Sequence, residues 1–276
     1  MRVSIIAIVA TVLVADICDA QTTRKRPTHA DAWDYTLTAF ATTLVAVDFA
    51  APQTIREPHW TQPILFDADA RSALRVSDAG TRTTLENTAW GLWFAQMGFP
   101  VLVDVPYAWA RYGPAVARDL FWQDAVTLTV AGALDALLRD MTGRLRPDVY
   151  DCWVAGRSGC LTSAESTRSF PGGHLINSAA AASLTCTQHL YMRLYGKPWD
   201  AITCATTIGA SFTVAMLRVM SDNHWATDQI VGAAIGGFVG WFVPWFMHFR
   251  RAPSAVFVPI PVAFERGAGA GVAAVF

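Results

Sequence analysis

The sequence predicts an all-α protein embedded in a membrane, and three observations support this prediction. From about residue 88 to residue 250 the chain is a series of apolar segments with helical length. Charged residues make up only 16% of the 276 residues, and the mean hydropathy is +0.30, which is apolar for a soluble protein of this size. The segment Gln229–Met247 contains no charged residue and is long enough to cross a bilayer. A soluble helical bundle with a very apolar core is the alternative.

The N-terminus has the pattern of an export signal. Arg2 is followed by the apolar run Val3–Ala15 and then by small residues, with Cys18 and Ala20 at the −3 and −1 positions of a cleavage site. Residues 1–20 are therefore predicted to form a signal peptide that is cleaved before Gln21. An uncleaved membrane anchor is the alternative.

Removal of this segment would leave four cysteines. An even number in an exported chain permits two disulfides. The pairing of Cys152 with Cys160, which are eight residues apart, is favoured over the others; the remaining two are Cys186 and Cys204.

The rest of the chain divides into three parts. Residues 21–87 hold most of the charge runs, several prolines and short helical patterns around 31–50 and 66–76, and we expect an N-terminal appendage near the mouth of the helical domain. Residues 88–250 form that domain, with predicted helices at 88–112, 119–138, 174–195, 200–220 and 225–249. The tail, residues 251–276, is punctuated by proline and glycine and is either a short strand pair or a disordered end.

Three separated clusters of polar residues carry the chemistry. They read RDMTGRLRP (residues 139–147), PGGH (171–174) and RVMSDNHWATD (218–228). Their motif positions offer an inventory suited to an oxyanion such as phosphate: Arg139, Arg146, Arg218, His174, His224 and Asp228. Guanidinium groups present planar donor forks that match phosphate oxygens and stabilise charge during phosphoryl transfer.

The histidines supply the reactive groups. His224 and Asp228 lie four residues apart, so on a helix the carboxylate could hold the imidazole in one tautomer and leave it competent as a nucleophile or base. His174 would be free to donate a proton to a leaving alkoxide. Gly172 and Gly173 allow close approach of the backbone, whose N–H groups at a helix start can bind an anion.

The clusters resemble the type 2 phosphatidic acid phosphatase superfamily, which also includes bacterial class A acid phosphatases and vanadium haloperoxidases. The family pattern is K-x6-R-P, then P-S-G-H, then S-R-x5-H-x3-D. Order and spacing agree here over roughly residues 120–248. The resemblance implies a helical bundle of this kind and a phosphatase that works without a metal ion or other cofactor.

Carried over by position, the resemblance makes His224 the nucleophile that forms a phosphohistidine. Asp228 would orient His224, and His174 would protonate the leaving group. The phosphate would be held by Arg139, Arg146, Arg218 and the backbone at Gly172 and Gly173.

Three positions depart from the pattern. Arg139 stands where the family has Lys, which keeps the charge but changes its reach. Leu217 replaces the Ser before Arg218. Gly172 replaces the Ser of the second motif, which removes a hydroxyl donor to a phosphate oxygen, a loss worth on the order of 10²-fold in rate.

Whether the protein is membrane-embedded or soluble determines which class of phosphate ester it would meet. A membrane-embedded site suits phosphorylated lipids, whereas a soluble periplasmic protein would suit small phosphate esters. Arg193 and Lys197 in one hairpin, and Arg250 and Arg251 after the last helix, fall opposite the predicted site, so the positive-inside rule places the site of a bacterial membrane protein on the periplasmic or exterior side. The net charge of −1 argues against a nucleic-acid partner.

Two other classes of function remain as alternatives: a vanadate-dependent haloperoxidase and a catalytically decayed protein that binds lipid phosphates. Residues outside the clusters are interpreted as structural. We expect Arg144 and Arg157 to form surface ion pairs, and His29, His59, His189 and His248 to have no catalytic role.

Overall fold

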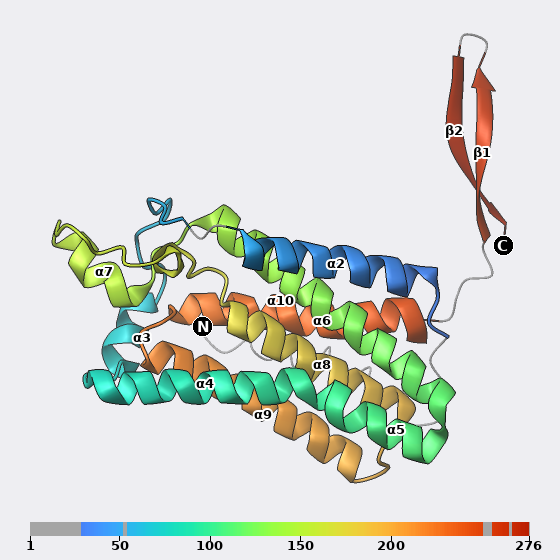
Figure 1. Cartoon of the computed structure of the whole chain (residues 1–276), viewed down its shortest axis with the longest axis horizontal. Helices are drawn as coiled ribbons and strands as arrows, with labels where there is room; N and C mark the ends of the chain where they lie inside the picture. Colours follow the sequence, from blue (N-terminus) through green and yellow to red (C-terminus); the bar gives the residue numbers. More distant parts are fainter. Residues whose placement is uncertain (1–28, 52–53, 251–255, 265–266, 276) are drawn as a thin grey trace, which may run out of the picture.

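The computed structural model describes residues 29–51, 54–250, 256–264 and 267–275. Long helices lie roughly side by side in one bundle (Figure 1). The helices before residue 146 are α2 (Ala32–Ala50), α3 (Asp67–Leu74), α4 (Ala79–Phe99), η1 (Pro100–Asp104), α5 (Val105–Tyr112) and α6 (Pro114–Thr142). They are followed by α7 (Pro147–Val154), η2 (Ala164–Thr167), α8 (Gly173–Met192), α9 (Trp199–Met220), α10 (Ala226–Pro244), η3 (Trp245–Phe249) and the strands β1 (Val256–Phe264) and β2 (Gly267–Val275).

The prediction of an all-α bundle is confirmed, and most predicted helices lie where the apolar patterns placed them. The tail contains an antiparallel strand pair, in which Val256 pairs with Val275 and Phe264 with Gly267. The predicted boundary at residues 87 and 88 falls inside α4, and α2 packs along α6 as part of the bundle. The predicted signal peptide lies outside the described residues.

Local sequence explains where the helices begin and end. Asp31 and Asp78 cap α2 and α4, because each carboxylate accepts a hydrogen bond from a backbone N–H in the first turn. Pro100 lacks an N–H, and the helix from α4 to α5 passes through the π-helical turn η1 at this residue. At the end of α6, Gly143 takes the left-handed conformation (φ +57°), where an added Cβ would lie 2.9 Å from Nδ1 of His59.

Helix α8 is the centre of the bundle and packs against α4, α6, α9 and α10. Its contact with α10 is very close because three glycines face it. A Cβ added at Gly232, Gly236 or Gly240 would lie 2.6, 2.1 or 2.2 Å from a carbonyl oxygen of the 172–180 segment. Only residues without a side chain permit this separation of the two backbones.

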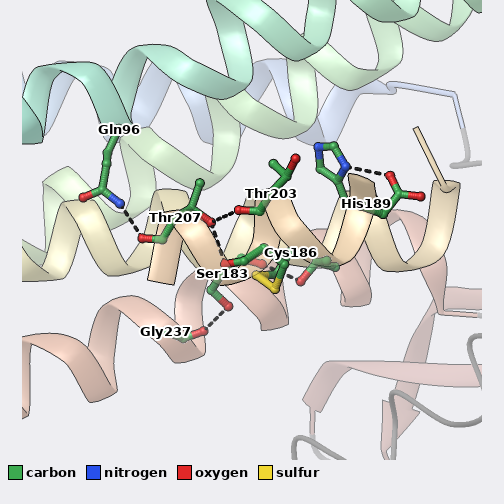
Figure 2. The surroundings of a disulfide bond; sticks show 10 residues. Gln96, Ser183, Cys186, His189, Thr203, Thr207 and Gly237 are labelled. Carbon is green, nitrogen blue, oxygen red and sulfur yellow. Dashed lines mark hydrogen bonds and ion pairs between the residues drawn. A yellow bond between two sulfur atoms is a disulfide. The ribbon is translucent and has the colours of Figure 1, made fainter. Parts of the chain in front are cut away.

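A disulfide and polar contacts join α8 to its neighbours (Figure 2). Cys186 of α8 is bonded to Cys204 of α9, and Ser183 donates a hydrogen bond to the carbonyl of Gly237 at 2.8 Å. From α4, Gln96 reaches the carbonyl of Thr207 at 2.7 Å. These contacts satisfy polar groups between helices that expose large apolar surfaces elsewhere.

Three histidines outside the clusters pair with carboxylates that connect helices. His189, fully buried, lies between Asp104 (3.3 Å) and Asp200 (2.8 Å), at the end of α8 far from His174. The other pairs are His248 with Asp34 at 3.0 Å and His29 with Asp119 at 2.7 Å. These geometries are consistent with a structural role.

We expect Gly236→Ala to lower the free energy of unfolding by about 1–3 kcal/mol, because the new methyl group must push α10 away from the Ile176 carbonyl. Gly237→Ala is the matched control, since nothing lies within 4 Å of its added Cβ and Ala favours a helix over Gly by up to about 1 kcal/mol. Thermal unfolding of the purified variants measures the difference. Equal stability of the two variants would contradict the close contact.

Candidate active site

The three sequence clusters meet at one end of the bundle, the left end in Figure 1. The first occupies the end of α6 and the residues after it, the second the start of α8, and the third the end of α9 and the start of α10. Hydrogen bonds connect them: Arg144 of the first cluster donates to the Asp228 carboxylate, and the Gly172 N–H of the second donates to the Asp228 carbonyl at 3.0 Å. Nδ1 of His224 also lies 2.8 Å from the carbonyl of Ser169, two residues before the second cluster. The clusters predicted from sequence therefore form a single site.

His224 is held as a nucleophile would need to be. Because a carbonyl oxygen only accepts hydrogen bonds, the contact with Ser169 places the proton on Nδ1 and leaves a lone pair on Nε2. Nε2 is buried and makes no hydrogen bond with the described residues. Burial, followed by the positive charges of Arg146 and Arg218, lowers the pKa of His224 well below 6.5, so the imidazole stays neutral at pH 7.

Asp228 supports His224 chiefly through Ser169. Its Oδ2 lies 3.8 Å from His224 Nδ1, and it accepts hydrogen bonds from the Ser169 hydroxyl at 2.6 Å and the Trp225 N–H at 2.9 Å. The Trp225 bond also caps the start of α10. The structure thus supplies a partner, Ser169, that residue spacing could not reveal.

The expectation that Arg144 forms a surface ion pair is wrong. Arg144 is fully buried, where its guanidinium donates to Asp228 and to Asp67 of α3, the latter at 2.6 Å. The guanidinium also lies 4.0 Å from the ring centroid of Trp60. Arg144 stands between Arg139 and Arg146 in the sequence, but no local pattern indicates its partners Asp67 and Asp228, which lie far away in the chain.

His174 lies against an aromatic wall formed by α4. Its ring centroid is 4.1 Å from that of Trp90 and 5.6 Å from that of Trp93. Burial, followed by the positive charge of Arg218 and by His224, lowers the pKa of His174 well below 6.5. Its Nε2 is buried and makes no hydrogen bond with the described residues.

The arginines form a cationic group whose charges are partly balanced by carboxylates. Arg146 binds Glu165 at 2.6 Å, and the same carboxylate lies 3.9 Å from Arg139. Arg218 contacts Glu86 of α4 at 3.3 Å. Nε of Arg146 and Nε of Arg218 are buried without a hydrogen-bond partner in the described chain, so both arginines retain a donor for an anion.

Arg139 is oriented by its own helix. Asp135, one turn earlier on α6, lies 2.8 Å from its Nε, and Asn177 of α8 donates to the same carboxylate at 3.2 Å. Asp135 also explains the glycine at 173, because an added Cβ there would lie 2.4 Å from Asp135 Oδ1. Gly173 is the first residue of α8, whose initial N–H groups have no partner within the helix and favour an anion.

The N-terminal part of the chain covers this end of the bundle. Arg71 of α3 binds Asp222 at 2.7 Å, just before His224, and Asp151 of α7 at 2.8 Å. Cys152 of α7 is bonded to Cys160 in the connection between α7 and α8. A depression lined by Asp48, His59, Arg139 and Arg168 opens beside the arginines, although neither His174 nor His224 lines it.

Sequence reasoning missed four contacts because they come from segments remote in the chain: Ser169, Glu86, Trp90 and Asp67. Their positions depend on how α3, α4 and the residues before α8 fold back on the site. Within the described residues, no three His, Cys, Asp or Glu side chains are grouped to hold a metal ion. The charged groups that converge are arginines, which suit an anion.

Comparison with known families agrees with this geometry. Residues 121–252 match the family model described as the PAP2 superfamily. This segment contains all three clusters, and the predicted relationship to the type 2 phosphatidic acid phosphatase superfamily is confirmed. Superfamily members are generally phosphatases. Comparisons with curated proteins and with solved structures found no match.

We expect Arg144→Ala to lower the free energy of unfolding by about 3–5 kcal/mol, because it leaves the carboxylates of Asp67 and Asp228 buried without their cation. Arg118→Ala, which removes an exposed partner of Asp119, should cost less than about 1 kcal/mol. Chemical denaturation of both variants tests this difference. Comparable small losses would show that Arg144 is dispensable to the network.

Proposed function

We propose that the protein hydrolyses phosphate esters through a phosphohistidine on His224. The observation that carries this proposal is the state of its imidazole: Nδ1–H donates to the Ser169 carbonyl, while Nε2 is buried near Arg146 and Arg218 and makes no hydrogen bond with the described residues. A neutral imidazole with a free lone pair next to guanidinium donors is suited to attack phosphorus.

In the first step, His224 Nε2 attacks the phosphorus atom and the bond between phosphorus and the ester oxygen breaks. Protonated His174 gives its proton to the departing alkoxide, which leaves as an alcohol. The lowered pKa of His174 makes it neutral in the free site at pH 7. A bound phosphate dianion offsets the arginine charges and so favours the protonated imidazole before the bond breaks.

In the second step, water replaces the alcohol. Neutral His174 accepts a proton from the water as its oxygen attacks phosphorus, and the bond from phosphorus to His224 Nε2 breaks. Inorganic phosphate leaves, and the two histidines return to their starting states. Arg139, Arg146, Arg218 and the amide of Gly173 hold the phosphate oxygens throughout, and no step uses a metal ion.

We further propose that the bundle lies in a membrane. Helices Trp199–Met220 and Ala226–Phe249 are long and apolar enough to cross one, and only 33% and 28% of their most apolar windows are buried within the protein. The core helix of a soluble protein would be mostly buried. Their outer faces instead expose large apolar side chains: Ile202, Ile208, Phe212, Ile230, Phe238 and Phe246.

The basic residues of the far end support an orientation. Arg111, Arg118, Arg193 and Lys197 lie at the short connections there, and Arg250 follows the last helix. The positive-inside rule assigns this end to the cytoplasm and the site to the outside. Arginines also occur at the site end, but several are paired with carboxylates, as Arg71 is with Asp151 and Asp222.

The surroundings of His174 favour an apolar leaving group. The group that His174 protonates must lie next to it, and the neighbouring surface is the aromatic wall of Trp90, Trp93 and Phe94. The side chains of Trp90 and Phe94 are 39% and 62% exposed on the outer face of α4. Such a surface can contact the glycerol and acyl part of a phosphorylated lipid.

We expect His224→Ala to lower phosphate release by about 10³-fold or more, because no other group can take over the covalent step. The protein is purified in detergent and assayed with EDTA on phosphatidate, an isoprenyl diphosphate and p-nitrophenyl phosphate. His189→Ala, which removes a buried histidine at the far end, is the control. Turnover that survives in His224→Ala, or a requirement for metal, would refute the mechanism.

We expect Trp90→Ala to raise the KM for phosphatidate by about 10- to 100-fold more than that for p-nitrophenyl phosphate, since burial of a large apolar group contributes about 1.5–3 kcal/mol. An effect through the contact with His174 would fall mainly on kcat, because His174 acts on the leaving group, so the ratio of KM values isolates the contact with lipid. Trp109→Ala, at an exposed position of α5, is the matched control. An unchanged ratio would favour a small-ester phosphatase.

A further inference from the structure

Gln229, in the first turns of α10, is a buried amide that the proposed mechanism does not use. Its residue is only 3% exposed, and neither Nε2 nor Oε1 makes a hydrogen bond with the described residues. Buried polar atoms nearly always have a hydrogen-bond partner, because a polar atom that loses its hydration on burial without gaining a partner destabilises the folded protein. An amide in this state at the end of the bundle that holds the site indicates a ligand.

The amide fills the space that a side chain at position 172 would occupy. A Cβ added to Gly172 would lie 2.6 Å from Nε2 of Gln229 and 3.0 Å from its Cδ. Position 172 is where the resembled family carries a serine hydroxyl that donates to phosphate. A side chain at position 172 and the side chain of Gln229 therefore cannot occupy this space together. In this protein the space holds the amide donor of Gln229, which comes from α10, and not a hydroxyl from the loop before α8.

The position of Gln229 places it between the two histidine-bearing segments. It shares a face of α10 with Gly232 and Gly236, which pack against α8, and so it is directed towards the start of that helix. The preceding residue, Asp228, accepts the Gly172 N–H through its carbonyl at 3.0 Å. His174 is two residues beyond Gly172, and the first N–H groups of α8 favour an anion at the same point.

We propose that Nε2 of Gln229 donates a hydrogen bond to a non-bridging oxygen of the substrate phosphate and so replaces the serine donor that Gly172 lacks. This inference rests on the proposed phosphatase function. It makes Gly172 and Gln229 a compensating pair: a glycine is required at 172 because the glutamine occupies its side-chain space. The departure of the second motif from the family pattern then removes no donor from the site.

The test is a double-mutant cycle between the two positions. Gln229→Ala should lower kcat on the preferred substrate by about 10²-fold, as expected for loss of one oxyanion donor. Gly172→Ser alone should give no gain over the unaltered protein, because its Cβ meets the amide. The double variant, in which the shortened side chain at position 229 makes room for the serine, should recover at least about 10-fold over Gln229→Ala.

Gln123→Ala is the matched control. Gln123 is also a buried glutamine with both amide atoms unpaired in the described structure, but it lies on α6 more than four turns from Arg139. Its replacement should leave kcat within about twofold of the unaltered protein, whatever it does to stability. If Gln229→Ala fails to fold, Gln229→Met serves in its place, because methionine keeps the volume of the side chain and removes both polar atoms. We expect the same loss of kcat in this variant.

Binding of orthovanadate, a phosphate-like oxyanion, separates this inference from the proposed function. Calorimetry with orthovanadate should show binding to the unaltered protein weakened about 10-fold or more by Gln229→Ala and restored in the double variant. An unaltered protein that binds orthovanadate in this pattern but hydrolyses no ester would refute only the proposed function. Full kcat in Gln229→Ala, or no recovery in the double variant, would overturn the assignment of Gln229.

Discussion

The buried carboxylate of Asp228 is the interaction on which the rest of the site depends. The carboxylate accepts hydrogen bonds from Arg144, from the Ser169 hydroxyl and from the Trp225 N–H. The backbone carbonyl of the same residue accepts a hydrogen bond from the Gly172 N–H. One residue thus joins the end of α6, the loop before α8 and the start of α10. Because a charge this deeply buried persists only with its partners in place, the geometry around His224 and the packing of the three segments are established together.

The sequence was sufficient to predict what depends on local pattern. Apolar periodicity located α6, α8, α9 and α10 to within a few residues, and motif spacing picked out the two histidines and three arginines that the fold brings to one end of the bundle. It failed for Arg144, Ser169, Trp90 and Gln229, whose roles depend on contacts between segments far apart in the chain. A single sequence shows which residues are present, but it does not show which remote side chain lies beside a given glycine. At Gly172 that side chain is Gln229, and only the structure reveals it.

The bundle combines a polar interior with an apolar exterior. Its helices meet through pairs such as His189 with Asp104 and Asp200, and through hydrogen bonds such as that from Gln188 to Asp124 at 2.7 Å, whereas large apolar side chains point outwards. These polar contacts lie alongside buried apolar clusters such as that of Leu120, Met192 and Leu194. The combination suits a bilayer, where polar groups must find partners inside the protein. The glycines of α10 that face α8 also suit a bilayer, because they allow close van der Waals packing of two helix backbones, which does not depend on water.

The carboxylate of Glu165 gives the arginine group a resident counter-ion. Attached to η2 beside the site, it contacts Arg139, Arg146 and Arg168 at 3.9, 2.6 and 3.3 Å, while 44% of its side chain stays exposed. In the proposed function, binding of a phosphate at Arg139 and Arg146 is therefore an exchange of one anion for another. In that scheme a tethered carboxylate at high local concentration takes the place of departing inorganic phosphate, which favours product release.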